Sequence, residues 1–251
     1  MIASAGFDGA CMDPSVSELD ECRGYAHLFD KFGLGSMVNA FPSAPEDMLP
    51  ILDFAAEVQA STVNVISGIM PIRPEDAVDD VRRWMGEAAD RNMPLLFETH
   101  RDGLLNDLYF TLQLMDLVPE MRLCADLSHF VVDREFRSPI PERDEQYIQS
   151  VLHRADCFQG RIANREQVQI QINFPQHQEW VAIFRGWWKD GMRAWRQRNA
   201  ADATLTFLCE LGPPPYAITD GEQNELSDRW SESLQIREWV RMIWTELDEE
   251  N

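Results

Sequence analysis

The sequence predicts a TIM-type α/β barrel, a (β/α)8 architecture, that forms one domain over residues 1–251. Three observations support this fold class. The chain has 251 residues, the length of one large α/β domain. Short apolar runs alternate with longer amphipathic stretches, which is typical of parallel strands joined by crossover helices. The short runs are apolar throughout, as expected for strands that are buried on both faces.

Seven apolar runs are the predicted strands: Phe7–Met12, Gly35–Ala40, Thr62–Ser67, Pro94–Thr99, Arg122–Leu127, Cys157–Ile162 and Thr204–Glu210. A closed barrel of this type has eight strands, so this pattern lacks one strand–helix unit. Because Gly6-Phe7-Asp8-Gly9 comes almost at once, the first unit is the one expected to be missing. Two interpretations stay open: the sequence starts late, or the barrel is open there and its two parallel strand edges are covered.

Helix signals lie between these runs. Ser15 and Ser17 are candidate N-caps for a helix over Glu18–Phe32. A proline followed by two acids opens the next two helices, at Pro45 and at Pro74. Further helices are predicted at residues 103–118, 142–155, 176–199 and 226–248. Residues 131–141 and 163–176 are the longest irregular connections, and both follow strands, which places them on the functional face of a barrel.

The composition limits the partners and the location. A net charge of −21, from 43 acidic and 22 basic residues, repels phosphate backbones and disfavours nucleic acid as a partner. No apolar run reaches the roughly 18 residues of a membrane span, and no signal peptide is recognisable, so a cytoplasmic location is expected. The five cysteines match no zinc pattern and are interpreted as small buried hydrophobic residues in a reducing compartment.

Three predicted strands end in an acidic residue, namely Glu98, Asp126 and Glu210. In a TIM barrel these strand ends converge on one pocket. Clustered carboxylates repel one another, and a divalent cation would neutralise them. The alternative is that each acid only caps a helix or solvates a loop. Three such acids, with His100 and His129 close behind two of them, favour a site.

The chain resembles the sugar phosphate isomerase/epimerase family of the xylose isomerase-like TIM barrel superfamily. Several motifs carry the resemblance, which covers nearly the whole chain. No single motif is very specific, but the order and spacing of the motifs together are specific. The motifs that carry it are Gly6-Phe7-Asp8-Gly9, Phe97-Glu98-Thr99-His100, Asp126-Leu127-Ser128-His129, Gln159-Gly160-Arg161-Ile162 and Glu210-Leu211-Gly212-Pro213-Pro214-Pro215-Tyr216.

The resemblance implies roles for these residues. Glu98 and Asp126 match two ligands of the family's metal and Glu210 matches the last, while the two glutamates also move protons between adjacent sugar carbons. His129 resembles a substrate-contacting histidine. Arg161 resembles an arginine that grips a substrate oxyanion, a task that its planar guanidinium suits.

One position departs from the family pattern. Relatives tend to have His-x-Arg where this chain has Gln159-Gly160-Arg161. With the amide oxygen of Gln159 the metal ligands are all oxygen atoms, which favours Mg²⁺ or Mn²⁺ over Zn²⁺. The alternative is a weakened site without catalysis. His153 lies on the preceding helix pattern and is disfavoured as a substitute ligand.

Three further residues are candidates for the pocket. His100 follows Glu98 by two residues, so on an extended strand the two side chains face the same side, and it is a candidate substrate contact. Asn64, inside an apolar strand, either presents an amide to the pocket or is a hydrogen-bonded core amide, which is favoured. Tyr216 follows a stiff proline run that fixes the depth of Glu210, and it can reach over the pocket.

Trp180, Trp187, Trp188 and Trp195 lie in one helical stretch. Their spacing places the first three partly on one face. Packing of that helix against the barrel is the favoured interpretation. The alternative is a homodimer interface, since large aromatic residues are enriched at interfaces.

The predicted function is a metal-dependent isomerase or epimerase of a small sugar, sugar phosphate or polyol. The proton next to a carbonyl would be transferred through an enediolate, with a glutamate on each face. The alternative is a catalytically weak or inactive barrel that binds a ligand or a partner. A DNA-repair endonuclease of the same superfamily is disfavoured, because such enzymes need more histidine ligands and a basic groove.

Overall fold

The computed structural model describes residues 1–250 as an alternation of strands and helices. The described strands number seven and follow the sheet in the order of the sequence. The pairs β1–β2, β2–β3, β3–β4, β4–β5 and β6–β7 are parallel. The predicted class, a parallel α/β fold with seven strands, is therefore confirmed. The chain divides into two compact units, Met1–Cys124 and Ala125–Asn251. A single domain over the whole chain stays a prediction.

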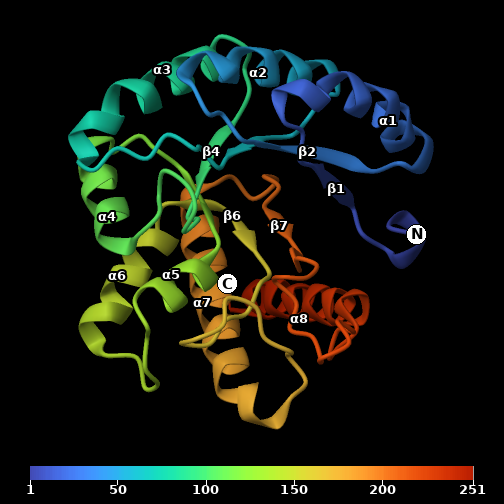
Figure 1. Ribbon diagram of the computed structural model, residues 1–251, viewed down its shortest axis with the longest axis vertical. Coiled ribbons are helices and arrows are strands. Elements are labelled where there is room, and N and C mark those ends of the chain that lie inside the picture. Colours follow the sequence, from blue (N-terminus) through green and yellow to red (C-terminus); the bar gives the residue numbers. More distant parts are fainter. Residues whose placement is uncertain (251) are drawn as a thin grey trace. The chain divides into compact units, whose positions relative to one another are not determined.

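Helices cover one face of the strands in the first unit. Figure 1 shows α1, α2 and α3 running along the same side of β1 and β2. The strands that begin in this unit are β1 (Gly9–Met12), β2 (Gly35–Ala40), β3 (Val63–Val65), β4 (Leu95–Glu98) and β5 (Leu123–Ala125). Its helices are α1 (Leu19–Phe32), α2 (Met48–Glu57), α3 (Val78–Ala89) and α4 (Leu108–Leu117).

The register of β2, β3 and β4 separates two kinds of side chain. Asn39 pairs with Asn64, and Asn64 pairs with Leu96. Phe97 lies on the other face, since successive side chains of a strand alternate. Its ring stacks on Trp84 of α3 at a centroid distance of 6.4 Å, which identifies that face as the one covered by helices. Asn39, Asn64 and Glu98, two residues after Leu96, therefore point to the opposite face.

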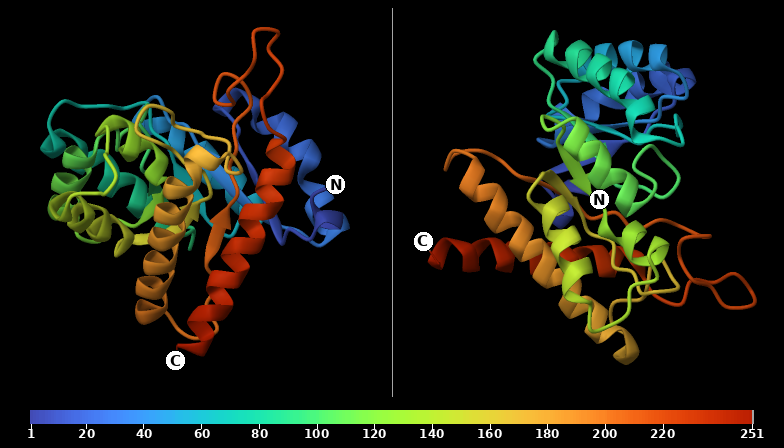
Figure 2. Two further views of the ribbon diagram at one scale, coloured as in Figure 1. Left: turned by 90° about the horizontal axis from the view of Figure 1, so that it is seen from below. Right: turned by 90° about the vertical axis from the view of Figure 1, so that its left-hand side faces the viewer.

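The second unit is built around two long helices. Figure 2 shows α7 (Gln178–Arg198) and α8 (Arg229–Glu249), which pack against each other, and a long loop that precedes α8. Its other elements are α5 (Leu127–Asp133), α6 (Glu142–Leu152), β6 (Ala155–Gln159) and β7 (Thr206–Leu208). Within residues 1–250, no helix has both the length and the apolar character of a membrane-spanning segment.

The tryptophans of α7 are core residues of this unit. All four are buried. Trp188 contacts Phe207 of β7 edge-to-face at 5.2 Å between ring centres, and Trp195 lies 6.0 Å from Trp244 of α8. Phe158 of β6 pairs with Phe207, so both strands turn an aromatic side chain toward α7. The favoured interpretation as helix packing is confirmed, and a homodimer stays a prediction.

The expected elements differ from the observed ones mainly at their ends. The range Gly35–Ala40 is correct, whereas the predicted strands Thr62–Ser67 and Thr204–Glu210 shorten to three residues each. One element was missed: the predicted strand Arg122–Leu127 ends at Ala125, and α5 begins at Leu127. The Asp126 side chain accepts a hydrogen bond from the backbone N–H of Ser128, and this N-cap ends the strand and starts the helix.

Two glycines of α7 test how tightly this helix packs on β6. A Cβ atom on Gly191 would lie 2.5 Å from Cε1 of Phe158, whereas one on exposed Gly186 would meet nothing within 4 Å. We expect Gly191→Ala to lower the free energy of unfolding by about 1–3 kcal/mol through overpacking. Gly186→Ala should raise it by up to about 1 kcal/mol, because alanine favours the helix. Urea unfolding of both variants measures the difference, and equal effects would show that α7 and β6 are not in close contact.

Candidate active site

Asp126 joins a strand end to a helix start. One carboxylate oxygen, Oδ1, accepts hydrogen bonds from the backbone N–H of Ser128 at 2.9 Å and from its hydroxyl at 2.5 Å. The other oxygen, Oδ2, faces two basic side chains: it lies 3.4 Å from Nε2 of His129 and 3.5 Å from Nε of Arg161. Asp126 and His129 are completely buried. The hydrogen bonds from Ser128 therefore hold the Asp126 carboxylate in place. Oδ2 stays directed toward His129 and Arg161.

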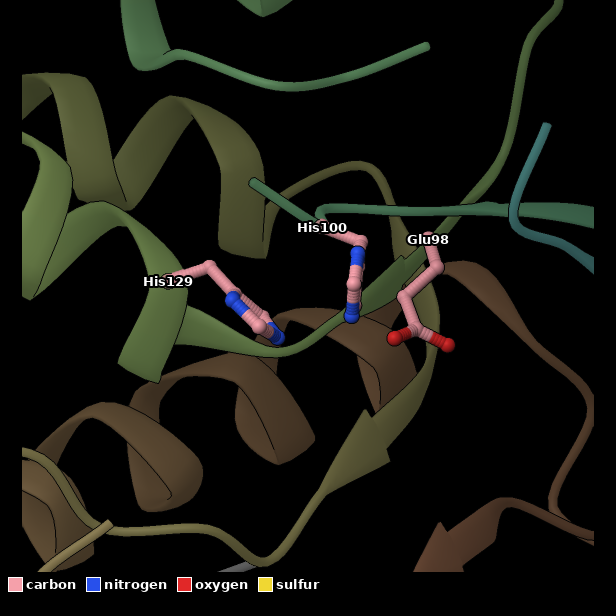
Figure 3. Close-up of side chains that lie close together, drawn as sticks. All are labelled: Glu98, His100 and His129. Carbon is pink, nitrogen blue, oxygen red and sulfur yellow. The ribbon is translucent and has the colours of Figure 1, made fainter. Parts of the chain in front are cut away.

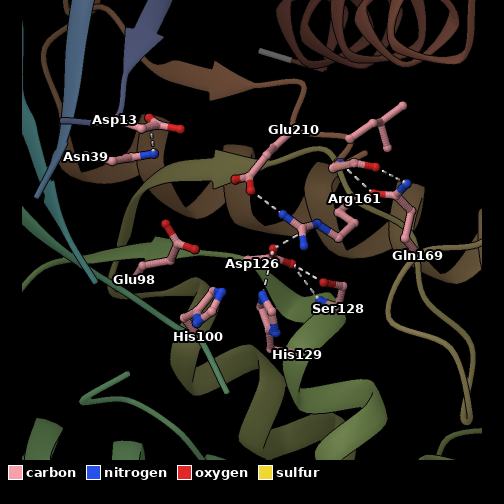
Figure 4. A network of polar contacts seen from close by, with 12 residues as sticks. Asp13, Asn39, Glu98, His100, Asp126, Ser128, His129, Arg161, Gln169 and Glu210 are labelled. Atoms are coloured by element: carbon pink, nitrogen blue, oxygen red, sulfur yellow. Dashed lines mark hydrogen bonds and ion pairs between the residues drawn. The ribbon is translucent and has the colours of Figure 1, made fainter. Parts of the chain in front are cut away.

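Arg161 is the central cation of this cluster (Figure 4). It is 1% exposed and forms ion pairs with both Asp126 and Glu210. The ring of Tyr216 lies over its guanidinium, with 4.5 Å between Cζ and the ring centre. Carboxylate oxygens of Asp126 and Glu210 lie within 4.8 Å of each other. Two acids thus share one buried arginine, an arrangement that offsets much of their mutual repulsion.

Gly160, the residue before Arg161, packs too closely against its neighbours to carry a side chain. A Cβ atom on Gly160 would lie 2.7 Å from Cε1 of Phe207 and 2.9 Å from Cγ2 of Ile236. Only glycine fits between these side chains without movement, so the backbone at the end of β6 comes close to β7 and α8. Gln159, the last residue of β6, is 1% exposed and points away from the helix-facing Phe158.

The loop after β7 is fixed by a side-chain clamp. Gln169 donates to the carbonyl oxygen of Gly212 at 2.9 Å and accepts from its N–H at 2.8 Å. Tyr216 folds back onto Gly212, where a Cβ atom would lie 2.9 Å from the tyrosine ring. Burial raises the pKa of the Cys209 thiol to about 12, so this neighbour of Glu210 stays protonated at neutral pH.

The first unit carries its own acidic strand end. Glu98, the last residue of β4, is 2% exposed, and its Oε2 accepts a hydrogen bond of 2.5 Å from the amide of Asn64. Asn64 also donates to Oδ1 of Asn39 at 2.9 Å, and Asn39 donates to the Asp13 carboxylate at 2.9 Å. Figure 4 shows this Asp13–Asn39 contact. Polar side chains therefore occupy the ends of β2, β3 and β4, together with the residue that follows β1.

Glu98 and His100 lie close to each other in the first unit. In Figure 3 both side chains point to the same side of their segment, and a carboxylate oxygen of Glu98 lies within 4.8 Å of a ring nitrogen of His100. Nδ1 of His100 accepts a hydrogen bond from the N–H of Asp102, so the proton of the neutral ring sits on Nε2. The imidazole can thus donate a hydrogen bond from Nε2.

Within the second unit, the structure brings together the predicted residues Asp126, His129, Arg161, Glu210 and Tyr216. His153 is exposed on the turn after α6 and takes no part, as expected. Asn39, Asp13 and the Gln169 clamp were not predicted from the sequence. Asn39 carried a usable signal, because it is a polar residue inside an apolar strand, as Asn64 is. The clamp joins residues 43 positions apart, which no local pattern reveals.

No protein-family model and no curated protein matches the chain in sequence. Solved structures do match it in fold. A xylose isomerase-like TIM barrel protein from Mycobacterium smegmatis, in complex with magnesium, is 16% identical with a TM-score of 0.65, over 98% of this chain and 86% of that chain. This chain shares the TIM-barrel fold of that protein.

Two other structures with this fold are similar over nearly the same length. D-allulose 3-epimerase from Methylomonas sp. is 14% identical with a TM-score of 0.63, over 96% of this chain and 88% of that chain. An L-ribulose 3-epimerase is 13% identical with a TM-score of 0.58, over 98% and 87% of the two chains. The TIM-barrel prediction is confirmed, and at these identities the roles of individual residues stay predictions.

Arg161 should be essential for the stability of the second unit. We expect Arg161→Met to lower the free energy of unfolding by about 3–5 kcal/mol, because it leaves two acids beside each other without a buried cation. Chemical denaturation measures this loss. Arg165→Met is the matched control: Arg165 pairs with Glu135 at 2.5 Å, but its side chain is 35% exposed. Its variant should unfold close to the wild type, and an equal loss in both variants would contradict the assigned role of Arg161.

Glu232 of α8 should make stability depend on pH. Its carboxylate accepts a hydrogen bond from the N–H of Ile172 in the loop after β6, but burial raises its pKa above the ordinary value for glutamate. A raised pKa means that the folded protein favours the protonated form, so this contribution is complete at low pH and is lost as pH rises through the raised pKa. Glu232→Gln should therefore be more stable than the wild type at pH 7, with a difference that disappears toward pH 4.

Thermal unfolding between pH 4 and pH 8 measures this difference. Glu249→Gln, at an exposed position of the same helix, is the control and should unfold close to the wild type. A Glu232→Gln variant that is less stable than the wild type at pH 7 would contradict the argument.

Proposed function

We propose that this protein is a metal-dependent isomerase or epimerase of a small sugar, sugar phosphate or polyol. One observation carries the proposal: buried carboxylates end β4 and follow β5, and Glu98 points to the face that the helices leave uncovered. In TIM barrels catalytic groups lie at the C-terminal ends of the strands. The shared fold supports the same reaction class, since structural neighbours include a D-allulose 3-epimerase and an L-ribulose 3-epimerase.

The donor set fits a hard divalent cation. Asp126 and Glu210 offer carboxylate oxygens within 4.8 Å of each other, and buried Gln159 offers an amide oxygen. We propose that Glu98 completes this set, because the fold brings consecutive strand ends to one face. Oxygen ligands favour Mg²⁺ or Mn²⁺ over Zn²⁺. The similar protein from Mycobacterium smegmatis was solved with magnesium, which supports a cation of this type.

The chain's own residues would carry the proton transfer. Glu98 and Glu210 are the proposed acid–base pair, one on each side of the carbon next to the substrate carbonyl. When bound, a divalent cation supplies Lewis-acid stabilisation of the negative charge that develops on the substrate oxygens. Arg161 and Tyr216 would hold the substrate from the second unit, together with His129. His100 would donate a hydrogen bond from its Nε2.

A second candidate function is a catalytically weak or inactive barrel that binds a ligand or a partner. The specific observation in its favour is that Arg161 already forms ion pairs with two of the proposed metal ligands, Asp126 and Glu210. Gln159 also favours this candidate, since the family that the chain resembles tends to have a histidine at this position. In this case the carboxylates would be balanced by arginine, and the cation would bind weakly.

Solvent exchange tests the proposed reaction directly. We expect the wild-type protein to exchange a substrate C–H proton with D₂O in the presence of Mg²⁺ or Mn²⁺, as followed by NMR with D-allulose and D-fructose. Glu210→Gln keeps the size of the side chain but removes the base, so exchange should fall by at least about a hundredfold. Unchanged exchange in this variant would overturn the mechanism.

Calorimetry in the same buffers separates the two candidate functions. Titration with Mg²⁺, Mn²⁺ and Zn²⁺ should give saturable binding that is lost in Asp126→Asn. This variant preserves the N-cap of α5, because asparagine caps helices as well as aspartate does. Absence of cation binding by the wild type would favour the non-catalytic barrel.

A further inference from the structure

The hydrogen bonds at the strand ends of the first unit run in one direction. Asn39 donates from Nδ2 to the Asp13 carboxylate, and its Oδ1 accepts from Nδ2 of Asn64. The same Nδ2 of Asn64 donates to the Glu98 carboxylate. The two ends of this series, Asp13 and Glu98, are carboxylates, which accept hydrogen bonds when ionised.

These two carboxylates determine how both amides are turned. If the amide of Asn39 were reversed, its oxygen would face the Asp13 carboxylate, and two acceptors would lie 2.9 Å apart. If the amide of Asn64 were reversed, its oxygen would face both Asn39 Oδ1 and the Glu98 carboxylate. Asn39 and Glu98 therefore fix the orientation of the Asn64 amide. Its Nδ2 faces these two acceptors, and its Oδ1 points away from them.

Oδ1 of Asn64 is a buried acceptor. Asn64 is 0% exposed, and none of residues 1–250 donates a hydrogen bond to this oxygen. Most buried polar atoms in proteins are hydrogen-bonded, and a missing bond costs stability. The amide points to the face opposite Trp84 and Phe97, the face that also carries Glu98. A core amide with only a structural role would satisfy both of its polar atoms.

We propose that Asn64 is a substrate-binding residue whose Oδ1 accepts a hydrogen bond from a hydroxyl group of an uncharged sugar or polyol. Its Nδ2 at the same time holds the Glu98 carboxylate in place. The proposal rests on the proposed function. It restricts the part of the substrate next to Asn64 to an uncharged group. The surrounding groups, Asp13, Asn39 and Glu98, present carboxylate and amide oxygens, which repel a phosphate but accept from hydroxyl donors.

Binding of uncharged ketohexoses tests this role. D-fructose, D-allulose and D-fructose 6-phosphate are titrated in the presence of Mg²⁺ by ligand-observed NMR, against the wild type and Asn64→Leu. Loss of one well-placed hydrogen bond corresponds to about a tenfold weaker affinity, so we expect Asn64→Leu to bind the uncharged sugars about tenfold or more weakly.

Thr62→Val is the matched control. Thr62 is the residue immediately before β3, is buried, and donates from its hydroxyl to the carbonyl oxygen of Pro94 at 3.1 Å. Thr62→Val loses one hydrogen bond within the protein, whereas Asn64→Leu loses the two that Asn64 donates. The control variant is expected to be less stable than the wild type but to bind the sugars within about twofold of it. The comparison separates a contact to the sugar from a general loss of stability.

A second measurement needs no stable Asn64→Leu variant. The wild-type protein is labelled with ¹⁵N-asparagine, and the side-chain signal of Asn64 is assigned by its loss in Asn64→Asp. We expect this signal to shift when D-allulose is added, because its amide gains a hydrogen bond. An unmoved signal at saturating sugar would overturn the proposal.

The possible outcomes separate a failure of the Asn64 role from a failure of the proposed function. If the wild type binds sugars and Asn64→Leu binds them as well as Thr62→Val does, Asn64 is not a sugar contact and the proposed function stands. Tighter binding of D-fructose 6-phosphate than of D-fructose, unaffected by Asn64→Leu, would also overturn the role of Asn64. If the wild type neither binds these sugars nor exchanges their protons, the proposed function and this inference fail together.

Discussion

The second unit depends on the ion pairs of the buried Arg161 guanidinium with Asp126 and Glu210. In a chain with a net charge of −21, taking Asp126 out of water is unfavourable unless a cation accompanies it. Arg161 supplies that cation, and it links the start of α5, through Asp126, to the segment after β7, through Glu210. Tyr216 covers the guanidinium. One side chain thus connects the helix start, the strand ends and the loop of this unit.

The alternation of side chains along the strands explains why polar groups gather where they do. Phe97 packs on Trp84 of α3, and Phe207 packs on Trp188 of α7, so each unit uses aromatic residues to fix which strand face the helices cover. A residue next to one of these aromatic residues in the same strand must point to the opposite face of the sheet. Glu98 follows Phe97 by one residue, and its position opposite the helices is therefore a consequence of core packing.

The fold class, the seven strands and most helix positions could be predicted from the sequence, because they rest on local periodicity. The three acidic strand ends were also visible, since each follows an apolar run. Two kinds of feature were not predictable. The start of α5 depends on Asp126 acting as an N-cap, which competes with the extension of the apolar run through Leu127. The pairing of Arg161 with Asp126 joins residues 35 positions apart and depends on the tertiary structure alone.

The two candidate functions differ in what balances the charge of the carboxylates: Arg161 alone in one, and a bound cation together with Arg161 in the other. With His129 neutral, Arg161 contributes the one positive charge against the two carboxylates of Asp126 and Glu210, and the group keeps a negative charge that a cation could balance. Gln159 adds an oxygen donor without adding charge. A histidine ligand must lose its proton before it binds a metal, whereas an amide has none to lose, so a site with Gln159 would hold its cation with less dependence on pH. In the proposed site, the glutamine would change the pH conditions for metal binding and would not remove the reason for it.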